Sequence, residues 1–181
     1  MREPPRLVAL LGAECTGKTT LAQALAERCG GLWVPEYLRA FCDARGRTPR
    51  REEQALIAEM QHLTILAARA EAQQRRLAWV FADTTALMPA LYSIQVFGDH
   101  SLVERGLRLQ RRFDLTLLCA PDLPWIADGI QRDGPETRAA VDQLLRTTLD
   151  AHGIAYANVQ GAGPDRLAAA LKALEPSRTV R

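Results

Sequence analysis

The sequence has 181 residues, a length typical of one domain whose core is large enough to fold without disulfide or metal cross-links. Its formal net charge is +2, with acidic and basic residues interspersed, so nothing indicates a nucleic-acid tail or a membrane-binding patch. No apolar run approaches the roughly 18 residues that would span a bilayer. The four cysteines lack paired spacing and neighbouring histidines, which favours free thiols over zinc ligands or disulfides. We therefore expect a cytoplasmic protein that binds neither nucleic acid nor membranes.

A glycine-rich loop connects the first predicted strand to the first predicted helix. Residues 6–11 form an apolar run typical of a buried strand, and the residues from Thr19 onward alternate like an amphipathic helix. Between them lies Gly12-Ala13-Glu14-Cys15-Thr16-Gly17-Lys18-Thr19, which matches the pattern G-x-x-x-x-G-K-[ST] of the phosphate-binding P-loop. A glycine turn before an ordinary helix is the alternative, but strand, loop and helix occur in the order that the motif requires.

The chemistry of this loop predicts binding of ATP and Mg²⁺. Inward-pointing backbone N–H groups, the positive end of the following helix and one ammonium group together stabilise a polyphosphate. Lys18 is expected to reach the β- and γ-phosphates, and the Thr19 hydroxyl to ligate Mg²⁺. The residues predicted to bind the nucleotide are Gly12, Glu14, Cys15, Thr16, Gly17, Lys18, Thr19 and Thr20.

A second short strand is predicted at residues 32–35, after the helix stop at 30–31, and Glu36 lies at its carboxyl end. In open α/β sheets ligands bind outside the carboxyl ends of the strands, so Glu36 is a candidate substrate ligand. Capping of the next helix, predicted at 37–46, is an alternative role that the sequence leaves open.

A long helix is predicted at residues 51–76. Its apolar residues recur at alternating steps of four and three, which predicts one buried stripe. This stripe comprises Leu56, Met60, Leu63, Ala67 and Ala70. We interpret Gln61 and His62 on the same helix as solvated or satisfied in the core, without a function.

The apolar run at residues 77–82 predicts a buried parallel strand that ends in Asp83. Beside a P-loop this is the Walker-B arrangement, in which the aspartate holds Mg²⁺ directly or through water. Thr19 and Asp83 are therefore the predicted metal ligands. The alternative is that Asp83 caps the following helix.

The remaining elements complete an α/β protein. Helices are predicted at 85–97, 102–112, 136–152 and 163–174, and strands at 113–119 and 155–159. Together they predict a P-loop kinase-like three-layer fold, with a five-stranded parallel sheet and helices on both faces. We expect one domain over residues 1–175 and a flexible tail at 176–181. The sequence gives no indication of oligomeric state.

The polar, glycine-containing segment at about 121–138 is typical of a mobile lid. Arg132 and Arg138 flank its loop, and its closure would bring their guanidinium groups onto the γ-phosphate. The alternative is that both are surface arginines paired with Asp133 and Glu136.

These motifs together resemble the NadR-type ribosylnicotinamide kinase family of P-loop proteins, over residues 7–159. The segments that carry the resemblance are 12–19, Val34-Pro35-Glu36-Tyr37-Leu38-Arg39, Phe81-Ala82-Asp83-Thr84, 114–118 and 124–132. The resemblance implies ATP-dependent phosphorylation of the 5′-hydroxyl of nicotinamide riboside, which gives nicotinamide mononucleotide in NAD biosynthesis. The chain departs from some relatives at Pro35, where they have Trp, and at Thr85, where they have a second acidic residue.

On this reading the candidate site residues fall into two sets. The candidate catalytic residues are Lys18, Asp83, Glu36, Arg132 and Arg138. The candidate substrate-binding residues are Glu36, Tyr37, Arg39, Asp83 and Trp125. A primary alcohol must lose its proton during transfer, and the sequence does not decide between Glu36 and Asp83 as the base; we favour Asp83 for metal and substrate contact. Tyr37 and Trp125 are candidates to stack on a pyridinium ring, with core packing as the alternative.

Two other functions stay open on the same scaffold. The protein would be either a kinase of another nucleoside or small alcohol, or a nucleotide-sensing, ATP-binding module that regulates a partner. Transfer of the γ-phosphate to an alcohol or only to water distinguishes these alternatives.

Overall fold

The computed structural model describes residues 3–126 and 134–175 and shows the expected α/β architecture. The strands are β1 (Arg6–Leu11), β2 (Leu32–Val34), β3 (Trp79–Asp83), β4 (Leu115–Cys119) and β5 (Ala157–Val159). The helices are α1 (Lys18–Cys29), α2 (Tyr37–Arg45), α3 (Gln54–Arg75), α4 (Leu87–Phe97), α5 (Val103–Gln110), α6 (Pro135–Ala151) and α7 (Gly163–Leu174), with a short 3-10 turn, η1 (Arg51–Glu53), before α3. The predicted tail at 176–181 and residues 127–133 of the predicted lid lie outside the described residues.

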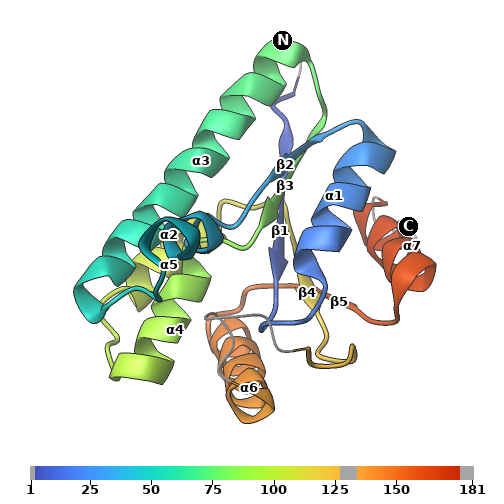
Figure 1. Cartoon of the computed structure of the whole chain (residues 1–181). Helices are drawn as coiled ribbons and strands as arrows, with labels where there is room; N and C mark the ends of the chain where they lie inside the picture. Colours follow the sequence, from blue (N-terminus) through green and yellow to red (C-terminus); the bar gives the residue numbers. More distant parts are fainter. Residues whose placement is uncertain (1–2, 127–133, 176–181) are drawn as a thin grey trace.

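All five strands are parallel, in the order β2-β3-β1-β4-β5, which confirms the predicted sheet. Helices α1 and α7 pack on one face, and α3, α4 and α6 cover the other (Figure 1). Strand β1 supplies both cores because its side chains alternate: Val8 and Leu10 pack toward α1, while Ala9 and Leu11 pack toward α4 and α6. Both faces of the central strand are therefore buried, as the apolar run of residues 6–11 predicted.

The buried stripe predicted for α3 is wrong. Leu56 and Leu63 are 47% and 46% exposed. The buried residues of α3 are instead Gln54, Ile57, Ala58, Gln61, Ile65 and Ala72. Ile65 and Ala72 pack on the sheet and Ile57 packs against α2, so the leucine spacing does not mark the inner face of the helix. Gln61 lies on that inner face and its amide is hydrogen-bonded there, which agrees with one of the two environments predicted for it.

The register of the sheet brings the carboxyl ends of the strands into one row. Leu10 of β1 lies opposite Asp83 of β3, and Ala82 of β3 lies opposite Val34 of β2. The loop that follows β1, the carboxylate that ends β3 and Glu36 just beyond β2 therefore meet at the same edge of the sheet. None of the helices within the described parts of the chain has the length and apolar character needed to cross a membrane.

Candidate active site

The phosphate loop is held in shape by its own hydrogen bonds. The Thr16 hydroxyl and the Lys18 ammonium group each donate to the carbonyl oxygen of Ala13, at 2.8 Å. Gly12 has φ +150°, and a Cβ there would lie 2.8 Å from the carbonyl oxygen of Cys119. Gly17 starts α1 with φ +73°. Both glycines are therefore required by backbone conformation, and at Gly12 a side chain would also clash with the neighbouring strand.

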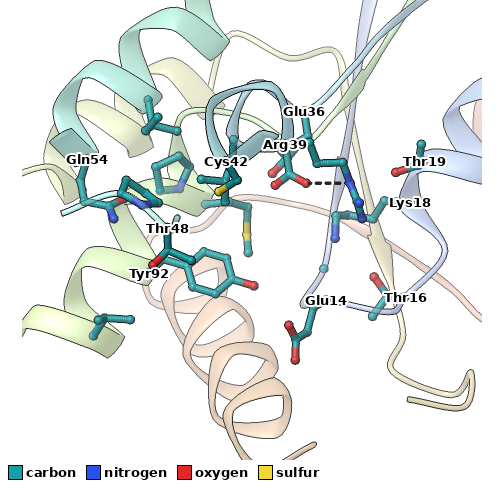
Figure 2. A pocket seen from close by; sticks show the side chains of 18 of the residues that line it. Glu14, Thr16, Lys18, Thr19, Glu36, Arg39, Cys42, Thr48, Gln54 and Tyr92 are labelled. Atoms are coloured by element: carbon teal, nitrogen blue, oxygen red, sulfur yellow. Dashed lines mark ion pairs between the residues drawn. The ribbon is translucent and has the colours of Figure 1, made fainter. Parts of the chain in front are cut away.

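A cavity of about 700 Å³ opens from this loop across the carboxyl ends of the strands. At one end, called here the phosphate end, it is lined by Gly12 and residues 14–20. The other end, called here the apolar arm, is formed by α2, the segment before α3, the first turn of α3, and α4. Its apolar side chains include Leu38, Ile57, Met88, Tyr92, Val96 and Phe97. Figure 2 shows Lys18 and Thr19 at the phosphate end, Glu36 and Arg39 between the two ends, and Gln54 and Tyr92 in the arm.

Thr19 and Asp83 lie together, as predicted for metal ligands. The Thr19 hydroxyl donates to Asp83 Oδ2 at 2.5 Å. Asp83 is only 1% exposed, and its Oδ1 has no hydrogen-bond partner among the described residues. The capping alternative for Asp83 is wrong, because the N-cap of α4 is Ala86. A hydroxyl beside a carboxylate with an unused oxygen is a donor set that fits Mg²⁺.

The residue after Asp83 has an unusual backbone conformation. Thr84 has φ +72°, a left-handed value that is rare for a β-branched residue. Its N–H donates to the carbonyl oxygen of Leu10 at 3.1 Å, which keeps it paired with β1. The chain therefore turns sharply at the carboxyl end of β3 and directs the following residues into α4.

Glu36 faces the cavity. It is also the N-cap residue of α2, the position that the capping alternative predicted, although its side chain makes no capping hydrogen bond. Its side chain is 18% exposed, and its carboxylate forms an ion pair with Arg39 Nε at 3.9 Å. Burial raises the pKa of Glu36, nearby Asp83 raises it further, and Lys18 and Arg39 oppose the shift.

Gln61 joins the two strand ends that carry these carboxylates. Its Oε1 accepts a hydrogen bond from the Tyr37 N–H at 2.7 Å. Its Nε2 lies 3.4 Å from the carbonyl oxygens of Pro35 and Thr84, to which it donates. One buried amide thus contacts the residues on both sides of Glu36 and the residue that follows Asp83. The sequence showed an amide on a helix but not which strand ends it would reach.

The two predicted lid arginines have different outcomes. Arg138, in the first turn of α6, is only 7% exposed, so its interpretation as a surface arginine is wrong. Its guanidinium group donates to the carbonyl oxygens of Leu123 at 2.9 Å and Cys15 at 3.4 Å, which connects α6 to the phosphate loop. Arg132 lies outside the described residues, so its lid role stays a prediction.

The two predicted stacking residues are not among those that line the cavity. Trp125 donates through its indole N–H to Glu14 Oε1 at 3.0 Å, which holds it against the phosphate loop. Tyr37 packs beside the buried cluster that contains Phe41. Their contact with a substrate stays a prediction. Thr85, where some relatives have an acid, is buried and donates to Gln110 at 2.7 Å.

Several cavity residues were not found by sequence reasoning. In the apolar arm they include Gln54, Met88, Tyr92 and Phe97. Residues 85–97 predicted a helix, but their nearly continuous apolar character gave no indication of which face would meet a cavity.

A buried arginine behind the phosphate loop was also missed. Arg166 of α7 is 4% exposed and donates to Asp122 Oδ1 at 2.6 Å and to the carbonyl oxygens of Ala120 and Val159. It thereby connects the ends of β4 and β5. No spacing in the sequence distinguishes it from the many surface arginines.

A central parallel strand that leads into a phosphate loop, with a carboxylate at the end of the adjacent strand, defines a P-loop kinase-like nucleotide-binding fold. A family model described as "AAA domain" matches residues 7–166, and the chain belongs to this family. The chain is also 26% identical over 167 residues to the trifunctional NAD biosynthesis/regulator protein NadR of Salmonella typhimurium (strain LT2). That alignment covers 88% of this chain and 39% of the relative.

Solved structures give the same result for the fold. NadR in complex with NAD and AMP-PNP has a TM-score of 0.74 and 21% identity, covering 93% of this chain and 48% of that chain. NadR in complex with NR also has a TM-score of 0.74, with 22% identity, covering 93% and 50%. Thymidylate kinase from Ehrlichia chaffeensis has a TM-score of 0.63 and 13% identity, covering 94% and 97%. The resemblance to the NadR-type kinase family is confirmed, and the chain spans half or less of the NadR proteins that it matches.

Proposed function

We propose that the protein is an ATP-dependent kinase that phosphorylates the 5′-hydroxyl of nicotinamide riboside and produces nicotinamide mononucleotide. The observation that carries the proposal is that Glu36 faces the same cavity as Lys18 of the phosphate loop. A carboxylate with a raised pKa beside a phosphate-binding ammonium group suits proton removal from an alcohol during phosphoryl transfer. The similarity to NadR, which has been solved with NR and with AMP-PNP, supports the choice of both substrates.

The phosphate end would stabilise charge on the transferred group. Lys18, the N–H groups of residues 12–19 and the start of α1 provide positive potential where the γ-phosphate would lie. Thr19 and Asp83 would hold Mg²⁺, which when bound neutralises charge on the β- and γ-phosphates. Arg138 keeps the loop in position through the Cys15 carbonyl.

Between the two strand-end carboxylates, we propose that Glu36 is the base. Asp83 is almost fully buried behind Thr19 and is not among the residues that line the cavity, whereas Glu36 is. An acceptor whose ring occupies the apolar arm would present its hydroxyl between the arm and the phosphate loop, where Glu36 stands. Arg39, paired with Glu36, would orient that carboxylate.

The experiment is a phosphoryl-transfer assay with the full chain, Mg²⁺ and ATP labelled at the γ-phosphate. The acceptors are nicotinamide riboside, the common ribonucleosides and deoxyribonucleosides, and shikimate as an unrelated alcohol. We expect the label on the 5′-oxygen of nicotinamide riboside, with the position checked by phosphorus NMR. Turnover of another nucleoside alone would contradict the proposed substrate, and release of label only to water would favour the regulatory alternative.

A further inference from the structure

Two glutamines of α3 are buried, and only one of them has hydrogen-bond partners for its side-chain amide among the described residues. Gln61 is hydrogen-bonded to backbone groups at the ends of β2 and β3. Gln54, seven residues earlier, is 6% exposed and lines the apolar arm of the cavity. Within residues 3–126 and 134–175, no group forms a hydrogen bond with the Gln54 side chain.

This arrangement leaves the Gln54 amide available to a molecule in the cavity. The amide of Gln54 is not among the fully enclosed polar groups that lack a partner, so it is open to the cavity, where water would occupy its hydrogen-bonding positions in the free protein. The surroundings are apolar: Ile57 lies almost one turn further along α3, and Val96 and Phe97 of α4 line the same arm. An amide in this position becomes satisfied when a bound molecule supplies the partners.

We propose that Gln54 hydrogen-bonds the ring substituent of the acceptor and thereby selects acceptors that carry a donor and an acceptor atom side by side, such as a primary carboxamide. A glutamine amide offers one carbonyl oxygen and two N–H donors, so it can pair with a carboxamide through two bonds. Tyr92 and the apolar side chains of the arm contact the faces of the ring. This inference rests on the proposed function, because it specifies which part of the acceptor the arm binds.

The test uses three ribosides that differ only at the ring substituent. Nicotinamide riboside has both a donor and an acceptor, 3-acetylpyridine riboside keeps only the acceptor, and nicotinic acid riboside carries a charged carboxylate. The full chain is compared with Gln54→Leu, with Gln54→Glu, which keeps the size but loses the donor, and with Gln73→Leu. Gln73 is an exposed residue of the same helix and serves as the matched control.

We expect the wild type to prefer the carboxamide over the acetyl compound by about tenfold or more in kcat/KM, since a lost partner leaves a buried amide unpaired. Gln54→Leu should raise KM for nicotinamide riboside by about 10- to 100-fold and discriminate among the three ribosides by less than about threefold. Its KM for ATP should not change, and its Tm should equal or exceed that of the wild type. Gln73→Leu should behave as the wild type.

Equal losses on all three ribosides in Gln54→Leu, or a lower Tm of that variant, would show a structural role and overturn the inference. Failure of the proposed function gives a different pattern: the wild type phosphorylates no pyridine riboside but accepts another nucleoside. The same variants are then compared on that nucleoside and on its analogue without the exocyclic donor. A Gln54 effect restricted to the nucleoside that has the donor supports the inference, and an equal effect on both overturns it.

Discussion

The two ends of the cavity are built from different parts of the chain. The phosphate end comes from one continuous segment, residues 12–20, whose shape is held by hydrogen bonds from the Thr16 hydroxyl and the Lys18 ammonium group to the Ala13 carbonyl oxygen. The apolar arm is assembled from side chains of α2, the segment before α3, α3 itself and α4. The shape of the phosphate end therefore depends on one short segment, whereas the shape of the arm depends on side chains from several elements that lie apart in sequence.

The largest expected effect is at the phosphate end. Lys18→Ala should lower phosphoryl transfer by about 10³-fold, because the variant loses the ammonium charge that the phosphate loop directs at the β- and γ-phosphates. The fold should remain, with an unchanged circular dichroism spectrum, since Lys18 lines the cavity and is not in the core. The only other lysine, Lys172 near the end of α7, provides the control Lys172→Ala. Transfer rates that are equal in the two variants would contradict the phosphate-binding role of Lys18.

Glu36→Gln should lower kcat by about 10²-fold if Glu36 is the base. The KM for ATP should stay within about threefold of the wild type, because the loss lies in the proton transfer and not in nucleotide binding. Steady-state kinetics with both substrates varied would measure this. A larger loss in Asp83→Asn with bound ADP and Mg²⁺ unchanged would assign the base to Asp83 instead.

The raised pKa of Glu36 predicts two pH effects. The base must be ionised, so kcat/KM of the wild type should fall on the acid side at a pH above the ordinary carboxyl value of 4.5. For stability the sign is opposite: a carboxyl group with a raised pKa in the folded state loses its stabilising contribution as pH rises through that pKa. Glu36→Gln should therefore have a higher Tm than the wild type at pH 8, and the difference should shrink toward pH 4. A constant difference would show that Glu36 titrates in the same way in the folded and unfolded states.

Alkylation of Cys15 should weaken ATP binding by about tenfold, since it places a bulky group inside the phosphate loop. The Cys15 thiol lines the cavity, whereas Cys119 is fully buried and desolvation raises its pKa to about 11, which keeps it unreactive. Calorimetric titration with ATP before and after iodoacetamide treatment measures the effect, with Cys15→Ser as the resistant control. Unchanged ATP affinity of protein alkylated at Cys15 would contradict it.

The smallest expected effect is in the apolar arm. Tyr92→Leu should raise KM for the acceptor about two- to tenfold through loss of an aromatic contact with the ring. The KM for ATP should be unaffected, and Tyr92→Phe, which keeps the ring, should bind the acceptor nearly as well as the wild type. If Tyr92→Leu changed both KM values equally, the two ends of the cavity would not act separately.

The same contrast explains what the sequence could predict. The five strands, the seven principal helices and the phosphate loop follow from local patterns, namely apolar runs, turn residues and a contiguous motif. Glu36 and Asp83 were found because each lies at the carboxyl end of a predicted strand. The sequence does not show that Asp83 is buried and bonded to the Thr19 hydroxyl while Glu36 faces the cavity, because the fold determines these contacts.

The sequence did not predict which residues line the apolar arm or which residue connects the ends of β2 and β3. Gln54 and Gln61 have the same side chain on the same helix, but one lines a cavity and the other holds two strand ends. The leucine spacing on α3 pointed to the wrong face, because α3 packs against the sheet through smaller and polar residues, whereas Leu56 and Leu63 are exposed. Such distinctions depend on contacts between segments far apart in sequence.

The left-handed turn at Thr84 places backbone strain next to the Asp83 carboxylate. A non-glycine residue in this conformation costs about 1 to 2 kcal/mol, and Thr84 adopts it next to Asp83 with support from Leu10 and Gln61. Glycine would relieve the strain but would also give this part of the chain more freedom in the unfolded state. The carboxyl end of β3 therefore keeps local backbone strain at the edge of the sheet, directly after Asp83.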